Sequence, residues 1–105
     1  MQLIDFNRST ADLHPGLALY WEHHDQRFAI TDLQTGPHQL LLITRSGRPL
    51  TLDQFRARCQ QVDPHAALFI AGTPAQRLYG YRLVTHLILL GWKEFFSWDY
   101  IKPWC

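Results

Sequence analysis

The sequence has little cysteine, little net charge and no long apolar run. Ten Lys and Arg against nine Asp and Glu leave a formal charge of +1 on 105 residues. So small an excess creates no field that would gather a polyanion, and we therefore expect no nucleic acid partner. Apolar runs such as residues 87–90 are far shorter than the roughly 20 residues of a membrane span. We expect a soluble chain without a membrane-spanning segment.

Only two cysteines are present, Cys59 and Cys105. One falls inside an expected helix and the other is the last residue, so they do not form the framework of a disulfide-stabilised domain. The first ten residues, "MQLIDFNRST", become polar after six positions and do not match a signal peptide. Reduced thiols without a leader predict a cytoplasmic protein.

Sequence motifs of catalysis and cofactor binding are also missing. None of the six histidines stands in an H-E-x-x-H motif, and no C-x-x-C pair occurs. His23 and His24 are adjacent in an expected turn, which should splay them apart as exposed side chains. "AGTPAQ" lacks the lysine and the glycine spacing of a phosphate-binding loop. We therefore predict no catalytic residue, no metal and no cofactor.

One alternative is a small enzyme that uses Cys59 as a nucleophile or a set of histidines and carboxylates. Such groups need not be neighbours in the sequence, but they must converge in one concave pocket. Against this alternative, Cys59 follows Leu52 and Phe55 on the inward stripe of the expected helix, which favours a buried, unreactive thiol.

What the sequence does contain is the composition of an ordinary folded protein, with 47% hydrophobic and 18% charged residues. A chain of this length can bury one continuous core, and we expect a single α+β domain over residues 1–105.

The amino-terminal half predicts mainly strands. A polar stretch, "HHDQ", separates two alternating apolar segments and indicates a hairpin. Thr51 and Gln54 have the spacing of a capping box and predict the start of a helix. The expected elements are a strand at residues 2–6, a hairpin at 17–31, a strand at 38–45 and a helix from Thr51 that ends at Asp63 and Pro64.

The carboxyl-terminal half predicts a strand, a long helix and a last strand. "HAALFIAG" is a short apolar run typical of a buried strand, and Thr73 with Gln76 repeats the capping-box spacing around Pro74. Helical spacing from residue 79 to residue 90 gives an apolar arc of roughly 200°, which is wider than a sheet alone would cover. Gly91 would end this helix in a left-handed conformation, and a strand at residues 92–100 would follow.

Together these elements predict a two-layer α+β sandwich, with a mixed sheet of about five strands and two helices on one face. The last strand, helix and strand would form a βαβ unit with a right-handed crossover.

Four segments, in order, carry a resemblance to a known family: "LLLITRSGRPLTLDQFRARC", "ALFIAG", "YGYRLV" and "LLGWKEFF". Their pattern, between about residues 38 and 99, resembles the soluble domain of the ExbD/TolR biopolymer-transport family. The resemblance implies the fold of that domain, and it assigns no functional residue to this sequence.

The carboxyl end, "GWKEFFSWDYIKPWC", holds three of the four tryptophans. Core filling accounts for one face of the expected strand, but apolar side chains also stand on the other face and beyond the strand. Aromatic residues are enriched at interface centres, and an aromatic edge strand can recruit another chain. We therefore predict a non-enzymatic protein-binding module (an adaptor, an inhibitor or an immunity-type accessory protein) that binds another protein or forms a homodimer. The predicted partner-binding residues are Tyr81, Phe95, Trp98, Ile101 and Trp104.

A second alternative rests on four arginines that are close in sequence: Arg45, Arg48, Arg56 and Arg58. Guanidinium groups hold phosphate or carboxylate through forked hydrogen bonds, so this cluster is a candidate anion-binding site. A nucleic-acid binder would require these residues to join Arg77 and Arg82 in one basic stripe.

Overall fold

The structure is a computed structural model that describes residues 1–91. The strand expected at residues 92–100 and the predicted partner-binding residues Phe95, Trp98, Ile101 and Trp104 lie outside the described residues. The elements follow in the order α1 (Leu3–Ser9), β1 (Ala18–His23), β2 (Gln26–Gly36), β3 (Gln39–Thr44), α2 (Leu52–Arg58), β4 (Ala67–Ile70), β5 (Gln76–Arg77), β6 (Tyr81–Val84) and β7 (Leu87–Leu90).

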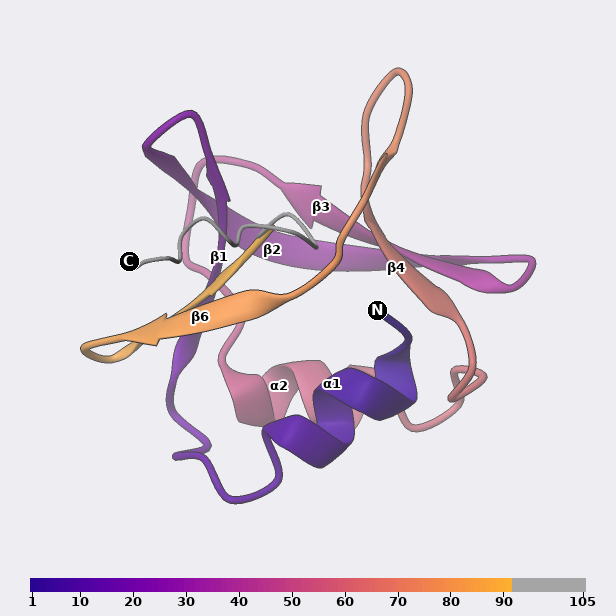
Figure 1. Ribbon diagram of the computed structural model, residues 1–105, viewed down its shortest axis with the longest axis horizontal. Helices are drawn as coiled ribbons and strands as arrows, with labels where there is room; N and C mark the ends of the chain where they lie inside the picture. Colours follow the sequence, from indigo (N-terminus) through magenta and orange to yellow (C-terminus); the bar gives the residue numbers. More distant parts are fainter. Residues whose placement is uncertain (92–105) are drawn as a thin grey trace, which may run out of the picture.

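The seven strands form one mixed sheet in the order β5-β4-β3-β2-β1-β7-β6. Two neighbouring pairs, β3 with β4 and β1 with β7, are parallel, and the other pairs are antiparallel. Although β5 and β6 stand at opposite ends of this order, only residues 78–80 separate them along the chain. Four residues of extended chain span at most about 14 Å, so the two ends of the sheet lie close together. The sheet is therefore strongly curled, and both helices lie below it in Figure 1.

The amino end of the chain pairs with β4. The amide of Leu68 donates to the Met1 carbonyl over 3.0 Å, and the amide of Leu3 donates to the Ala66 carbonyl over 2.9 Å. The amino group of Met1 also donates to the carbonyl of Leu78 over 3.0 Å. These bonds hold the start of α1 beside β4, below the sheet (Figure 1).

The strand expected at residues 2–6 is wrong, because only Gln2 is extended, in a single bridge with Ala67, and α1 begins at Leu3. Asp5 stands at the third helical position, and its carboxylate accepts from the Gln2 amide over 3.1 Å, which satisfies a donor at the helix start. A helix of seven residues is too short to show helical periodicity clearly in a sequence.

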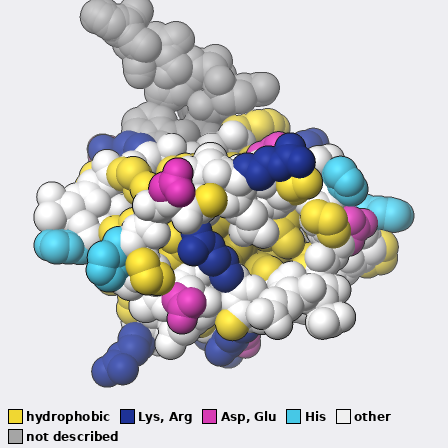
Figure 2. All heavy atoms as spheres, turned by 90° about the horizontal axis from the view of Figure 1, so that it is seen from below, with side chains coloured by type: hydrophobic (Ala, Val, Ile, Leu, Met, Phe, Trp, Pro, Cys, Tyr) yellow, Lys and Arg dark blue, Asp and Glu magenta, His cyan; other side chains and the backbone are white. Residues whose placement is uncertain are grey.

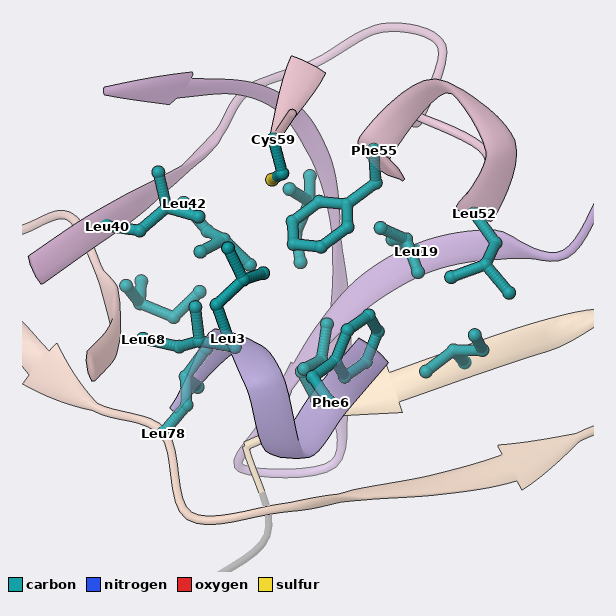
Figure 3. Packing of buried hydrophobic residues seen from close by; sticks show 14 of the residues in the cluster. Leu3, Phe6, Leu19, Leu40, Leu42, Leu52, Phe55, Cys59, Leu68 and Leu78 are labelled. Carbon is teal, nitrogen blue, oxygen red and sulfur yellow. The ribbon is translucent and has the colours of Figure 1, made fainter. Parts of the chain in front are cut away.

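Helix α1 supplies the centre of the core. Phe6 is completely buried, and its ring meets the rings of Phe55 on α2 and Tyr81 on β6 edge-on, with centroid distances of 5.3 and 5.4 Å. Figure 3 shows Leu3 and Phe6 pointing from α1 toward the side chains of the strands and of α2. The remaining buried members of this cluster are Leu19, Ile30, Leu40, Leu42, Leu52, Cys59, Ala66, Leu68, Ile70, Leu78, Ile88 and Leu90.

The predicted hairpin is confirmed as β1 and β2, joined by His24 and Asp25 with φ of 51° and 64°. Positive φ at both positions is the two-residue turn that matches strand twist. The hairpins β2–β3 and β6–β7 also turn through two residues, the second of which is His38 with φ of 57° and His86 with φ of 66°. Three of the six histidines are thus exposed turn residues.

The first predicted capping box is confirmed at the start of α2. The Gln54 amide donates to Thr51 Oγ1 over 3.2 Å, and the Thr51 amide donates to Gln54 Oε1 over 3.0 Å. The expected inward stripe of Leu52, Phe55 and Cys59 is buried. Because β3 and β4 are parallel neighbours, α2 is the helix of a βαβ unit.

The long helix predicted from Thr73 to residue 90 is wrong, since this segment contains β5, β6 and β7. Glycine costs about 1 kcal/mol inside a helix, so Gly80 opposes a helical conformation there. "YRLV" and "LILL", separated by Thr85 and His86, have the length and spacing of a hairpin. Gly91 does adopt a positive φ, of 116°, but it follows a strand.

The structure thus confirms the α+β class and corrects its details. Seven strands replace the expected five, and a curled sheet replaces the two-layer sandwich. In the described part of the chain there are two helices, as expected, but α1 takes the place of the helix predicted after Thr73. The βαβ unit consequently lies at β3, α2 and β4 and not at the carboxyl end.

Replacement of the cap residue in Thr51→Ala should lower the free energy of unfolding by about 1 kcal/mol, because the Gln54 amide loses its acceptor. The matched control is Thr73→Ala, which removes the threonine of the second capping-box sequence where no helix begins; its effect should stay within about 0.5 kcal/mol. Urea unfolding followed by circular dichroism measures both values. Equal losses in the two variants would contradict the assignment of α2.

The turn of the β6–β7 hairpin allows a second matched comparison. His86→Gly should raise the free energy of unfolding by about 0.5–1 kcal/mol, because glycine adopts a positive φ without the strain that a side chain brings. Thr85→Gly should lower the free energy of unfolding. Thr85 is not in the left-handed region, so glycine relieves no strain there and only increases the backbone entropy of the unfolded chain. The same urea experiment compares them, and stabilisation by both changes would argue against this turn.

Candidate functional site

The two ends of the sheet differ in their capacity to pair with another chain. Strand β5 has two residues, both exposed, and Pro74 stands shortly before them, so this end is blunted. Strand β6 has four residues and pairs with β7 on one side. Within residues 1–91 no strand pairs with its other side. Strand β6 is therefore the more accessible edge of the described sheet.

This edge also carries exposed apolar side chains. Tyr79, just before β6, is 46% exposed, and Leu83 on β6 is 49% exposed. The guanidinium of Arg77 lies over the Tyr79 ring, 5.9 Å from its centroid, in a cation–π contact. The structure thus places apolar surface along one short stretch, residues 79–83, which we call the β6 edge, and the positive charge of Arg77 on β5 lies over its first residue.

Tyr81 is the one predicted partner-binding residue within the described part of the chain, and it is partly buried. Its ring packs against Phe6, and its hydroxyl donates to Ser9 Oγ over 3.0 Å. Tyr81 therefore joins β6 to α1, whereas Tyr79 and Leu83 are exposed. The predicted helix would place Tyr79 and Leu83 on one helix face. The feature of the sequence that indicates a strand is the two-residue spacing of Tyr81 and Leu83 after Gly80.

Arg82 joins β6 to β1. Its Nε donates to Glu22 Oε1 over 3.0 Å, and its Nη2 donates to Glu22 Oε2 over 2.6 Å. The hydrogen bond with the Glu22 carboxylate raises the pKa of Arg82. Leu89, the β7 residue in register with Arg82, is also fully buried although it lies outside the main core cluster. Because Ile88 and Leu90 are buried on one face of β7 and Leu89 on the other, both faces of this strand are covered.

The four arginines of the candidate anion site have separate surroundings. Arg56 donates to the carbonyl of Thr10 at the end of α1, and Arg58 pairs with Asp32 over 2.7 Å at the surface. Arg48 is exposed in the turn after β3, and Arg45 lines a surface depression. Two of the four guanidinium groups are thus engaged in intramolecular contacts.

The depression that Arg45 lines has a volume of about 340 Å³. It lies between the β1–β2 hairpin and the segment that follows β3. Its lining residues are Tyr20, Arg27, Phe28, Ala29, Thr44, Arg45, Ser46 and Gly47. Arg27, which is not one of the four arginines close in sequence, thus lines the same depression as Arg45.

The groups required by the enzyme alternative are not gathered in this depression or in a smaller one of about 250 Å³ beside His14 and His86. Neither is lined by Cys59 or by a carboxylate. Burial raises the pKa of the Cys59 thiol to about 11, so it is protonated at neutral pH.

The histidines do not gather around a metal site in the described part of the chain, where no group of three or more His, Cys, Asp and Glu side chains is placed to hold an ion. The expectation that His23 and His24 splay apart is wrong. Their ring centroids are 3.9 Å apart, because His23 stacks on Trp21 and His24 turns back over it.

The surface seen from the helix side carries charges of both signs among hydrophobic side chains, and no broad field of one sign covers it (Figure 2). No helix within residues 1–91 has the length and apolar character needed to cross a membrane.

Comparison of the chain with protein families, curated proteins and solved structures finds no match. The likeness to the ExbD/TolR domain therefore stays a prediction from sequence pattern.

The Cys59 thiol of the folded protein should not react with thiol reagents at neutral pH, and the protein should become less stable as the pH rises above about 9. In a Cys105→Ala background, a disulfide reagent at neutral pH should label Cys59 only after denaturant is added. Because the pKa is about 11 in the folded chain and ordinarily 9.0, folding favours the protonated thiol. The contribution of the protonated Cys59 thiol to the free energy of unfolding is complete below about pH 9, and it is lost as the pH rises toward 11.

The further replacement Cys59→Ala should reduce the loss of stability over this range, which urea unfolding at a series of pH values measures. The comparison uses the slopes of the two proteins, because alanine also changes the packing. Rapid labelling of the folded protein would contradict the buried position of Cys59.

Proposed function

We propose that the protein is a non-enzymatic binding module that adds an extended segment of another protein to the β6 edge. The observation that carries this proposal is the contrast between the two ends of the sheet. Strand β5 is short and polar, whereas β6 is longer and carries the half-exposed Leu83. An unpaired strand binds extended peptide through main-chain hydrogen bonds, and adjacent side chains select the sequence.

The side chains of the β6 edge indicate the chemistry of the partner. Leu83 and Tyr79 favour apolar residues at alternate positions of the incoming segment. Arg77 is exposed and forms no ion pair within the described residues. A carboxylate in the partner segment would complement it. The proposed partner is therefore an extended segment with alternating apolar residues and at least one acidic residue.

The aromatic carboxyl-terminal sequence supports the same class of function. Phe95, Trp98, Ile101 and Trp104 follow β6 and β7 in the sequence, and three of these four residues are of the aromatic types that are enriched at interfaces. An inhibitor, an adaptor or an accessory protein would use such a surface without catalysis. Self-association through the same edge is the competing occupant.

Selection from a displayed library of random ten-residue peptides tests the proposal. Peptides that bind the full chain should have alternating apolar residues with Asp or Glu. Leu83→Lys should weaken their binding by about tenfold or more, because a lysine on an edge strand opposes pairing. Thr35→Lys, which adds the same charge at an exposed position of β2, should change the affinity less than about twofold. Circular dichroism verifies that both variants are folded.

Isotope-labelled protein locates the binding site, since amide signals of residues 79–84 should shift on addition of a selected peptide. Failure to select any peptide, or selection of peptides that bind Leu83→Lys equally well, would reject the β6 edge as the binding site. Dimerisation that increases with concentration and is lost in Leu83→Lys would instead identify a second copy as the occupant.

A further inference from the structure

We propose that the depression beside the β1–β2 hairpin binds a compact organic oxyanion, whose phosphate or carboxylate group is held by Arg27 and Arg45. This site is separate from the β6 edge and does not depend on the function proposed for it. It also differs from the arginine cluster expected from the sequence. Of that cluster only Arg45 lines the depression, and the second arginine there is Arg27.

The backbone explains why a hollow exists at this place. Strand β2 pairs with β1 through residues 26–29 and with β3 from Ile30 onward, and the register shifts just after Ile30. The depression lies where β2 changes partner. Ala29 stands there in register with Tyr20 of β1, and its carbonyl accepts from the Arg45 amide over 3.3 Å. A methyl side chain between these larger neighbours leaves room for a ligand.

Arg27 lies two positions before Ala29, so the alternation of strand residues places both on the same face. Both guanidinium residues that line the depression, Arg27 and Arg45, are exposed. Two arginines that line one hollow offer positive charge to an anion, and the planar guanidinium matches the oxygens of phosphate and carboxylate.

The charges of these arginines are not neutralised within the described residues. Neither Arg27 nor Arg45 forms an ion pair there. The acidic residue nearest to Arg27 across the strands is Glu22, its register partner on β1. Both carboxylate oxygens of Glu22 are occupied by Arg82, at 3.0 and 2.6 Å. No Asp or Glu lines the depression, so an external anion is the available counter-charge.

The remaining lining supplies further hydrogen-bond donors. Tyr20, Thr44 and Ser46 each bring a hydroxyl group. Gly47 has a φ of 137°, and no neighbouring atom would lie within 4 Å of a side chain there, so its backbone is open to a ligand. A volume of about 340 Å³ exceeds what one oxyanion needs and lies at the lower end of small-molecule sites. The ligand class is therefore an oxyanion attached to a small organic group.

Titration of the full chain with phenyl phosphate and with benzoate, followed by amide chemical shifts, tests the site. At least one probe should shift the signals of residues 27–29 and 44–47 in a saturable way. Arg27→Gln and Arg45→Gln should each weaken binding about tenfold or more. Arg48→Gln is the matched control, because it removes the same charge from the same turn outside the depression, and binding should stay within about twofold.

A third variant, Ala29→Leu, fills the floor of the depression without changing its charge and should abolish binding. Binding of phenyl phosphate alone identifies a phosphate ligand, and binding of benzoate alone identifies a carboxylate; either result supports the site. The proposal is overturned if neither probe saturates below about 10 mM. It is also overturned if Arg48→Gln weakens binding as much as the other two charge variants, or if Ala29→Leu binds normally while folded.

Discussion

The edge-on packing of Phe6 between Phe55 and Tyr81 is the interaction on which the rest of the structure depends. The sheet curls until β5 and β6, the strands at its two ends, approach each other without pairing. Helix α1 lies below the curled sheet, with Phe6 contacting α2 in one direction and β6 in the other. Burial of a phenylalanine is worth about 1.5–3 kcal/mol, and ring contacts of this geometry add to it. One residue of a short helix thus joins β6 to α2, in addition to the pairing of β6 with β7.

The parts of the fold that sequence predicts correctly are those specified locally. The β1–β2 hairpin is set by a polar turn between alternating segments, and α2 is set by the reciprocal bonds of Thr51 and Gln54. The same spacing at Thr73 and Gln76 does not start a helix, because the capping sequence stabilises an end only when the following residues favour the helix. There, pairing of β5 with β4 and of β7 with β1 determines the outcome. These contacts join segments far apart in sequence, which periodicity does not reveal.

The candidate surfaces depend even more on distant pairings. Sequence indicates a surplus of apolar groups after residue 78, but Tyr81 and Leu83 share one face of β6, and only the packing of α1 distinguishes Tyr81, whose ring meets Phe6, from Leu83, which is exposed. The arginines show the same limit. Proximity in sequence grouped Arg45 with Arg56 and Arg58, whereas the fold directs Arg56 to α1 and Arg58 to Asp32. Arg27 and Arg45 line one depression because it lies where β2 changes its partner from β1 to β3.

The parallel pairing of β1 with β7 has a consequence for synthesis of the chain. Ala18 to Trp21 of β1 align with Leu87 to Leu90 of β7, so the sheet joins an early segment to one of the last described. Contacts between such distant segments form late, since loop closure must precede them. While the ribosome is still adding residues, β1 has β2 on one side and an unsatisfied backbone on the other. In the nascent chain β1 is thus an exposed edge strand, whereas in the folded protein it lies inside the sheet between β2 and β7.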